Sequence, residues 1–111
     1  EGQFVAPSEK ALKAGAAGAN WGNGFYEILT NGPGKETWPI SGATFILLHK
    51  VQDKPENGAQ VIKFFDWALK NGSAMADQLD YVPLPSPVVA LIDKQFTMVK
   101  DAAGKVVAMN N

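Results

Sequence analysis

Small hydroxyl residues flank a glycine at Ser41-Gly42-Ala43-Thr44, a combination that can bind an anion. Hydroxyl groups and successive backbone N–H groups in such a turn form a concave surface that accepts oxyanions. Anion-binding loops of this kind usually open a helix, whose N-terminal dipole adds to the attraction. Here an uncharged apolar run follows, and the sequence contains neither a P-loop motif nor the dinucleotide-binding glycine fingerprint. The pattern favours a structural turn over an anion site.

His49 is the only histidine and could act as a general base, because an unperturbed histidine titrates near neutral pH. An enzyme such as a phosphatase is the function that this residue would suggest. No serine or cysteine elbow accompanies it, and Asp53 is the only carboxylate close to it in sequence. A surface histidine at the end of a strand is the favoured interpretation, and we predict no catalytic residue.

Asp77 and Asp80, followed by Tyr81, could form a metal or polar cluster, since a spacing of three places two carboxylates on one helix face. The further oxygen ligands of an EF-hand-like pattern are missing, so solvated or capping carboxylates are favoured. Phe64, Phe65 and Trp67 could form a stacking platform, but their helical spacing favours core positions. We predict no metal site in this chain.

The charge balance excludes several classes of partner. Ten lysines and no arginine offset eleven acidic residues, which leaves a net charge of −1 and no footprint for nucleic acid or anionic lipid. Without arginine the chain cannot make the bidentate guanidinium contact common at phosphate sites. Without cysteine it has no disulfide, thiolate metal site or cysteine nucleophile. We predict no cofactor and no nucleic-acid partner.

The chain is long enough for one small domain, at 111 residues of which 46% are apolar and 19% charged. Its longest uncharged apolar run, Ala43 to Leu48, is too short to span a bilayer. The first residues, Glu1-Gly2-Gln3, do not resemble a signal peptide. From the residues alone we expect a cytoplasmic chain, or else a mature or partial one.

The first half of the chain predicts two short helices and one strand. Ser8 is a suitable N-cap for a helix through Ala11 to Ala16, and apolar spacing predicts a second helix from Trp21 to Leu29. Trp38-Pro39 imposes an extended approach. The run Ala43 to Leu48 has almost no polar face, which predicts a strand buried on both sides of a sheet.

The second half predicts two longer helices. One begins with Asp53 as N-cap and Glu56 completing a capping box, and ends at Asn71-Gly72 in a left-handed turn. A helical turn over 75–79 and an extended connector over 81–85 follow, and Ser86 starts the last helix. A turn over 101–105 and a short strand over 106–108 complete the chain. The predicted apolar faces comprise Val61, Phe64, Phe65, Ala68 and Leu69 on the first helix, and Val88, Leu91, Ile92, Phe96 and Val99 on the second.

Several segments in fixed order carry a family resemblance over residues 36–101. They are "WPISGATFILLHK", "KPENGAQVIKFFDWALKNG", "MADQLDYVPLPSPVVALI" and "KDAAGK". In these the chain closely resembles the C-terminal part of the periplasmic phosphate-binding proteins of phosphate-specific ABC transporters. Residues 1–35, with "ILTNGPGKETWPI" at the junction, resemble the same family more loosely.

The resemblance implies an α/β fold: the C-terminal part of a two-lobe periplasmic-binding-protein (type II) fold, not a complete independent domain. Residues 1–35 would be a piece of the second lobe, 36–40 a hinge crossing, and 41–111 the C-terminal part of the first lobe. Trp38, Pro39 and Ile40 would be hinge residues and not ligands. Such lobes close around one dehydrated anion held by many hydrogen bonds.

The resemblance also implies the partners. They are the remainder of the same protein, which carries the phosphate ligands, inorganic phosphate itself, and ABC permease subunits. The location would be periplasmic or cell-surface attached, peripheral to the membrane. The family's ligands include an arginine followed by a Ser-Gly-Thr turn, and this chain has no arginine. No ligand residue is therefore carried over to this segment, and Ser41 to Thr44 is not that turn.

Alternatives of other classes remain at this point. The chain could come from a relative that binds another oxyanion, or from a protein that acts in scavenging or adhesion at the cell surface. An enzyme is the least favoured class, for the reasons given for His49. Because a segment drawn from two lobes exposes apolar faces, we expect this chain alone to be poorly stable unless another chain or a second copy covers it.

Overall fold

The first helix begins where the sequence places its cap. In the computed structural model, which describes residues 2–107, α1 spans Glu9–Gly18. Ser8 has an extended backbone, and its Oγ accepts a hydrogen bond from the N–H of Ala11. This satisfies one of the donors that the first helical turn leaves open. The predicted N-cap and helix are confirmed.

Helix α2 begins one residue later than predicted, because its N-cap is Lys54 and not Asp53. α2 spans Pro55–Asn71, with Lys54 at the N-cap position and no side-chain cap. The capping box of Asp53 and Glu56 was therefore wrong, and proline at the first helical position defines the start instead. Gly72 has φ −86°, so the predicted left-handed ending was also wrong. The chain turns directly into α3, Ser73–Gln78, close to the predicted helical turn.

The last helix and the turn beyond it agree with the prediction. α4 spans Ser86–Phe96, and Pro87 lies in its first turn. After it, the side chain of Asp101 accepts hydrogen bonds from the N–H groups of Ala103 and Lys105, which closes the predicted turn. The predicted strand over 106–108 is reduced to a single bridge from Val106 to Lys100, and Ala108 lies outside the described residues.

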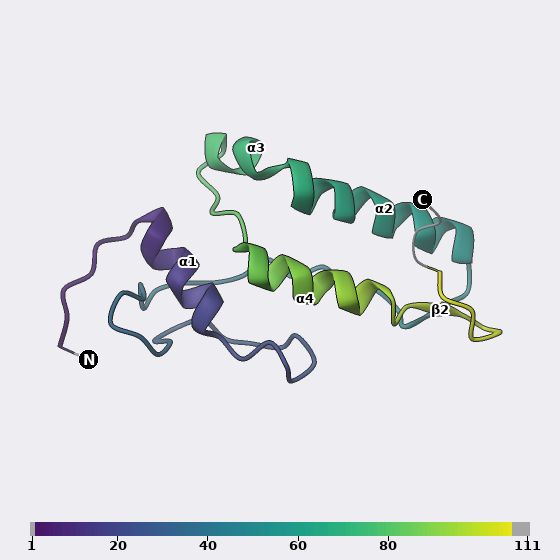
Figure 1. Ribbon diagram of the computed structural model, residues 1–111, viewed down its shortest axis with the longest axis horizontal. Helices are drawn as coiled ribbons and strands as arrows, with labels where there is room; N and C mark the ends of the chain where they lie inside the picture. The colour runs from purple at the N-terminus through teal and green to yellow at the C-terminus, as the bar shows by residue number, and fades with distance from the viewer. Residues whose placement is uncertain (1, 108–111) are drawn as a thin grey trace.

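The sheet in the described part of the chain has two very short strands. β1, Val51–Gln52, pairs in parallel with β2, Lys100–Asp101, with Val51 opposite Lys100. The fold is therefore a mixed, helix-rich arrangement with little sheet (Figure 1).

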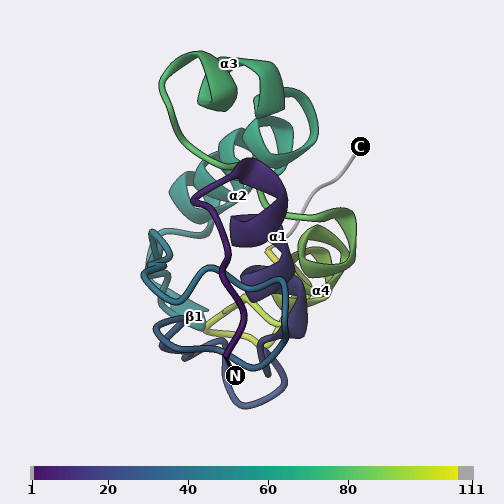
Figure 2. The ribbon, with the colours of Figure 1, turned by 90° about the vertical axis from the view of Figure 1, so that its left-hand side faces the viewer.

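Helix α4 lies at the centre of the arrangement. α1 packs against it on one side and α2 on another, with the strands beyond its C-terminal end (Figures 1 and 2). Two apolar clusters result. The first contains Ala16, Trp21, Leu29 and Val88, and the second contains Ile62, Phe96 and Val99. α4 contributes a buried side chain to each.

The predicted strand Ala43 to Leu48 is extended but belongs to no sheet in the described structure. Ala43 packs against the first cluster and Leu48 against the second. Ile46 and Leu47 are 53% and 92% exposed. The prediction of burial on both faces is therefore wrong for this chain as it stands, because nothing in it lies over the outer face.

The predicted helix from Trp21 to Leu29 was wrong. Residues 21–25 form turns, and both Gly24 and Phe25 have positive φ, at 80° and 57°. The surrounding asparagines and glycines favour such turns over helix. Trp21 and Leu29 are nonetheless buried, and the Trp21 indole N–H donates to the carbonyl of Ala16 at 2.7 Å.

The buried face of α2 differs from the predicted one. Ile62 is fully buried, with Phe65 and Leu69 packed beside it. Phe64 and Trp67 are 60% and 50% exposed, so their prediction as core residues was wrong. The buried stripe of α2 is the one that faces α4. The sequence contains two adjacent apolar stripes on this helix and does not decide between them.

The molecule is too open for a closed domain of its mass. A folded chain of 11.9 kDa should expose about 5,900 Å², whereas this chain exposes 8179 Å². Its radius of gyration is 15.9 Å, against about 13 Å for a compact chain of this length. The chain therefore exposes about 2,300 Å² more than a closed domain of its mass.

We expect the isolated chain to lose its helical circular dichroism gradually in urea, without a sharp transition. Two small clusters bury too few side chains to offset the conformational entropy of ordering this many residues. Sedimentation at the same concentration gives the association state. A sharp, cooperative transition of a monomer would contradict this expectation.

Candidate functional site

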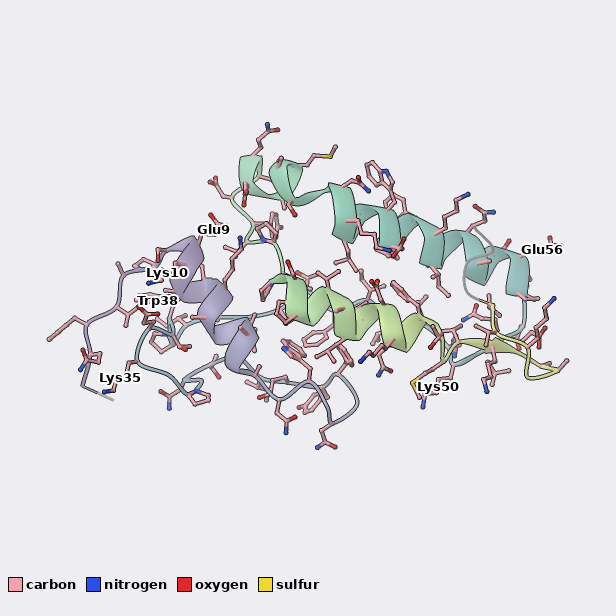
Figure 3. All side chains as sticks on the ribbon, in the orientation of Figure 1. Glu9, Lys10, Lys35, Trp38, Lys50 and Glu56 are labelled. Atoms are coloured by element: carbon pink, nitrogen blue, oxygen red, sulfur yellow. The ribbon has the colours of Figure 1, made fainter. Side chains whose placement is uncertain are left out.

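The connection from α1 to β1 is the part of the chain on which the predicted hinge and the candidate anion turn both lie. Trp38 lies beside α1 and Lys50 near the strands at the other end (Figure 3). The connection thus runs along much of a molecule whose extents are 52 × 29 × 17 Å. It divides into a bonded part, residues 31–41, and an unbonded part, residues 42–48.

Hydrogen bonds hold the first part to α1 and to the preceding loop. The N–H of Trp38 donates to the carbonyl of Ala11 at 3.2 Å, and the N–H of Asn31 donates to the carbonyl of Pro39 at 2.8 Å. The hydroxyl of buried Thr37 donates to the carbonyl of Pro33 at 2.9 Å. We name this set of bonds, over residues 31–41, the α1 latch.

The predicted hinge residues fall at the end of the latch. Trp38 and Pro39 take part in latch hydrogen bonds through their backbones, and Ile40 is 75% exposed. Sequence reasoning missed Thr37 and Asn31 as latch residues. The only local signal was at Thr37, because threonine hydroxyls commonly bond to backbone a few residues away. Asn31 bonds through its backbone N–H, for which its residue type gives no signal.

The candidate anion turn uses its polar groups internally. Ser41 is 8% exposed, and its Oγ donates to the carbonyl of Trp38 at 2.8 Å. The side chain of Thr44 is exposed to solvent, and no helix starts at the turn. The preference for a structural turn is consistent with this geometry, because the buried hydroxyl already has its partner.

His49 and the acidic pair stand apart from any catalytic arrangement in the described residues. His49 is exposed, and its backbone carbonyl accepts from the Gln52 side chain at 2.6 Å. Asp77 lies in α3, whereas Asp80 lies beyond its end with φ 60°, so the two do not share a helix face. No group of three or more potential metal-ligating side chains occurs within residues 2–107.

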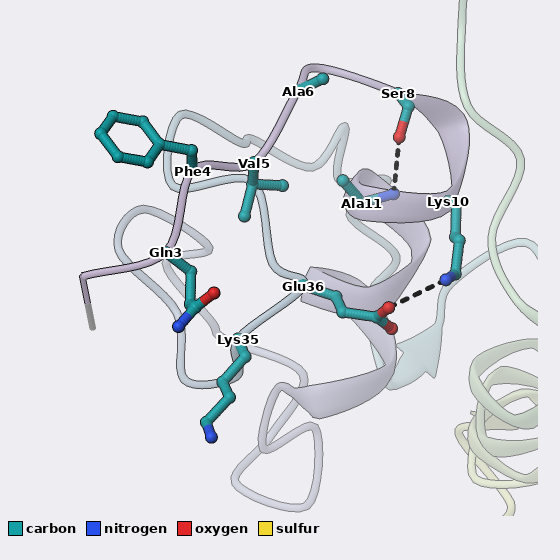
Figure 4. Close-up of a pocket in the computed structure, with 9 residues that line it drawn as sticks. All are labelled: Gln3, Phe4, Val5, Ala6, Ser8, Lys10, Ala11, Lys35 and Glu36. Carbon is teal, nitrogen blue, oxygen red and sulfur yellow. Dashed lines mark hydrogen bonds and ion pairs between the residues drawn. The ribbon is translucent and has the colours of Figure 1, made fainter.

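A shallow hollow lies between the N-terminal segment and the start of α1 (Figure 4). Lys10 spans one side of it and bonds to Glu36 at 2.9 Å, but both side chains are more than two-thirds exposed. Phe4 points away from the hollow into solvent. An exposed ion pair of this kind contributes little free energy and marks no ligand site.

One ionic cluster joins α2 to α4. Lys70 Nζ lies 2.5 Å from Asp66 Oδ1 on its own helix and 4.0 Å from Asp93 Oδ2 on α4. The hydrogen bond to Asp66 and the charge of Asp93 raise the pKa of Lys70 above its ordinary value of 10.5. A raised lysine pKa stabilises the fold below about pH 10.5, and that contribution is lost as the pH rises further. Since Lys70 is exposed, the cluster orients the helices more than it stabilises them.

The unbonded part of the connection carries the most unusual surface of the molecule. Between Gly42 and Leu48 the backbone makes no hydrogen bond to any other described residue. Its side chains are uncharged. Its one aromatic residue, Phe45, packs against Trp21, with 6.5 Å between the ring centroids. An apolar extended segment without backbone partners exposes unpaired N–H and C=O groups together with apolar side chains.

No family model matches the chain. It is 50% identical over 107 residues to "Phosphate-binding protein PstS" of Pasteurella multocida, which is 94% of this chain and 31% of that protein. It is 47% identical over 97 residues to the protein of the same name from Haemophilus influenzae, covering 86% of this chain and 29% of the relative. One from Xylella fastidiosa is 37% identical over 94 residues. The chain spans about 30% of the length of these relatives.

Replacing Thr37 by Val should loosen the α1 latch. The substitution removes the hydrogen bond to the Pro33 carbonyl at constant side-chain shape, at a cost of about 1 kcal/mol. Amide exchange at Trp38 should then accelerate roughly fivefold, as measured by hydrogen–deuterium exchange with NMR. Thr44→Val, at an exposed threonine without such a bond, is the matched control. Equal exchange rates at Trp38 in both variants would contradict the latch.

Proposed function

Because the chain is homologous over most of its length to proteins named phosphate-binding protein PstS, we propose that it is the C-terminal segment of an inorganic-phosphate receptor. The receptor delivers phosphate to an ABC importer. The observation that carries this proposal is the 50% identity over 107 residues, at 31% coverage of the relative. Identity at that level along nearly the whole chain supports a shared role of the parent protein.

Within that receptor the segment supplies scaffold and hinge rather than phosphate contacts. A dehydrated phosphate needs many directed donors around one point. In this chain the buried hydroxyls of Thr37 and Ser41 already donate to backbone carbonyls, and arginine is absent. We therefore place the phosphate ligands in the remainder of the protein.

The two parts of the connection suit different mechanical roles. One hydrogen bond of the α1 latch, from the Trp38 N–H to the Ala11 carbonyl, joins the connection to α1, which supports residues 1–35 as a piece of the second lobe. Residues 36–40, with Trp38, Pro39 and Ile40, serve as the hinge crossing. Residues 41–111 then belong to the first lobe, where α4 joins both apolar clusters. Lobe closure would bend the chain at the end of the latch.

The receptor works in the periplasm or attached to the cell surface, with permease subunits as its membrane partners. No helix within the described residues is long and apolar enough to cross a bilayer. A relative that binds another oxyanion is the second candidate, since the chain itself holds none of the ligands that would discriminate between anions.

Calorimetry with inorganic phosphate tests this function. We expect saturable binding by the full-length parent and none by the 111-residue chain, because the chain lacks the donors. Ser41→Ala in the parent should leave affinity within about twofold, since its hydroxyl is already bonded to the Trp38 carbonyl. Binding of sulfate or arsenate in preference to phosphate would support the second candidate.

The same parent protein tests the enzyme alternative. We expect no release of phosphate from a phosphate ester above the rate of the His49→Ala variant. Activity that depends on His49 would overturn the assignment as a receptor without catalysis.

A further inference from the structure

Asparagine followed directly by glycine occurs at four places in the chain: Asn23-Gly24, Asn31-Gly32, Asn57-Gly58 and Asn71-Gly72. This dipeptide is the one most prone to spontaneous deamidation, because glycine has no side chain to hinder the attack of its backbone nitrogen on the asparagine side chain. The attack requires a glycine N–H that is free of other bonds and a backbone that can rotate. The four pairs differ in both respects.

The two pairs at the ends of α2 are held by the helix. Gly58 is buried, and its N–H donates to the carbonyl of Lys54 at 3.0 Å. The N–H of Gly72 donates to the carbonyl of Ala68 at 2.8 Å, and the side-chain amide of Asn71 is bonded back to the helix at 2.9 Å. Attack at either pair would first break a hydrogen bond of the helix or of its C-cap. Both pairs therefore react only after local opening.

The pair at Asn31-Gly32 belongs to the α1 latch. The N–H of Asn31 donates to the carbonyl of Pro39 at 2.8 Å, and Asn31 has a φ of 53°. A Cβ added at Gly32 would lie 3.6 Å from the Thr37 side chain, so this glycine packs against the latch. The N–H of Gly32 bonds to no other described residue, but the latch restrains the backbone rotation that the attack requires.

The pair at Asn23-Gly24 lacks each of these restraints. Both residues are exposed and lie in the turns over residues 21–25. Neither the Asn23 side chain nor the Gly24 N–H forms a hydrogen bond to another described residue. Gly24 has a φ of 80°, and a Cβ added to it would meet no atom within 4 Å. The nitrogen of Gly24 is therefore free, and the space around it is open.

We propose that Asn23 is a site of spontaneous deamidation and the fastest of the four. The backbone nitrogen of Gly24 attacks Cγ of Asn23 and loses its proton, and ammonia leaves from Cγ, which closes a succinimide ring. Water then opens the ring. Addition of water at Cγ gives aspartate, whereas addition at the backbone carbonyl carbon gives isoaspartate, in which the main chain runs through Cβ and Cγ. The overall change takes up water and releases ammonia, without oxidation or reduction.

The reaction alters a turn that holds the first apolar cluster together. Either product adds one negative charge to a chain whose net charge is −1. Isoaspartate also lengthens the main chain by a methylene between Trp21 and Phe25, whose rings pack with their centroids 6.0 Å apart. Across the same turn, the N–H of Phe25 donates to the carbonyl of Trp21 at 3.4 Å. The isoaspartate fraction should therefore show faster amide exchange at Phe25 than the unmodified chain.

Peptide mapping by mass spectrometry tests the site in the 111-residue chain, incubated at mildly alkaline pH so that the glycine nitrogen loses its proton more readily. We expect deamidation at Asn23 to be about tenfold faster than at Asn57 and Asn71, with Asn31 in between. In concentrated urea the four rates should agree within about twofold, because unfolding removes the restraints. Equal rates without urea, or a faster reaction at any other pair, would overturn the proposal.

Three variants separate the restraints from the site itself. Thr37→Val removes a latch hydrogen bond, so deamidation at Asn31 should accelerate about fivefold while that at Asn23 stays within about twofold. Asn23→Gln should abolish the fast phase of ammonia release, because glutamine would have to form a larger ring, which closes far more slowly. Asn71→Gln is the matched control and should keep the fast phase. A fast phase that persists in Asn23→Gln would overturn the proposal.

Discussion

Ile92 on α4 packs against both apolar clusters, and most of the tertiary structure depends on this shared contact. On one side lie α1 and the turns around Trp21, and on the other lie α2 and the segment that leads to β2. Without the central helix the two clusters would have no common wall, since α1 and α2 each pack on α4. The described residues are thus organised around α4, which contributes to both apolar clusters.

The molecule combines well-formed helices with an open surface because helices and strands find their backbone partners in different places. Helices satisfy their own backbone hydrogen bonds, so they persist when a neighbouring layer is missing. A strand cannot, because every one of its backbone partners lies on another segment. The same chain therefore shows α2 over 17 residues and only two-residue strands.

This asymmetry also sets what the sequence could predict. Local signals located α1 from Ser8, α4 from Ser86-Pro87, and the turn after Asp101, because each depends on residues a few positions apart. The helix over 21–29 failed because apolar spacing was weighed above the turn preference of the glycines and asparagines around Trp21.

The stripes of α2 failed for a different reason. Ile62, Phe65 and Leu69 form one apolar stripe of the helix, and Val61, Phe64 and Ala68 form the adjacent stripe. Only the position of α4 decides which stripe is buried. Ala43 to Leu48 belongs to the same class: its extended backbone follows from local sequence, whereas its burial depends on contacts that a local pattern does not specify. The α1 latch likewise joins residues that are far apart in sequence, such as Trp38 and Ala11. No local sequence pattern predicts which distant residues such hydrogen bonds join.

The buried polar side chains are already engaged in hydrogen bonds within the chain. Thr37 and Ser41 use their hydroxyls to fix the chain, and the Trp21 indole N–H does the same at Ala16. A donor already bonded to a carbonyl gains little by exchanging that carbonyl for an anion, and its release would leave a buried acceptor unpaired. Recognition of an oxyanion requires donors that are held in place by other groups and left free themselves. In the described residues the buried donors are used to fix the chain to itself. This is consistent with the proposed role of the segment as a scaffold and not as a source of phosphate ligands.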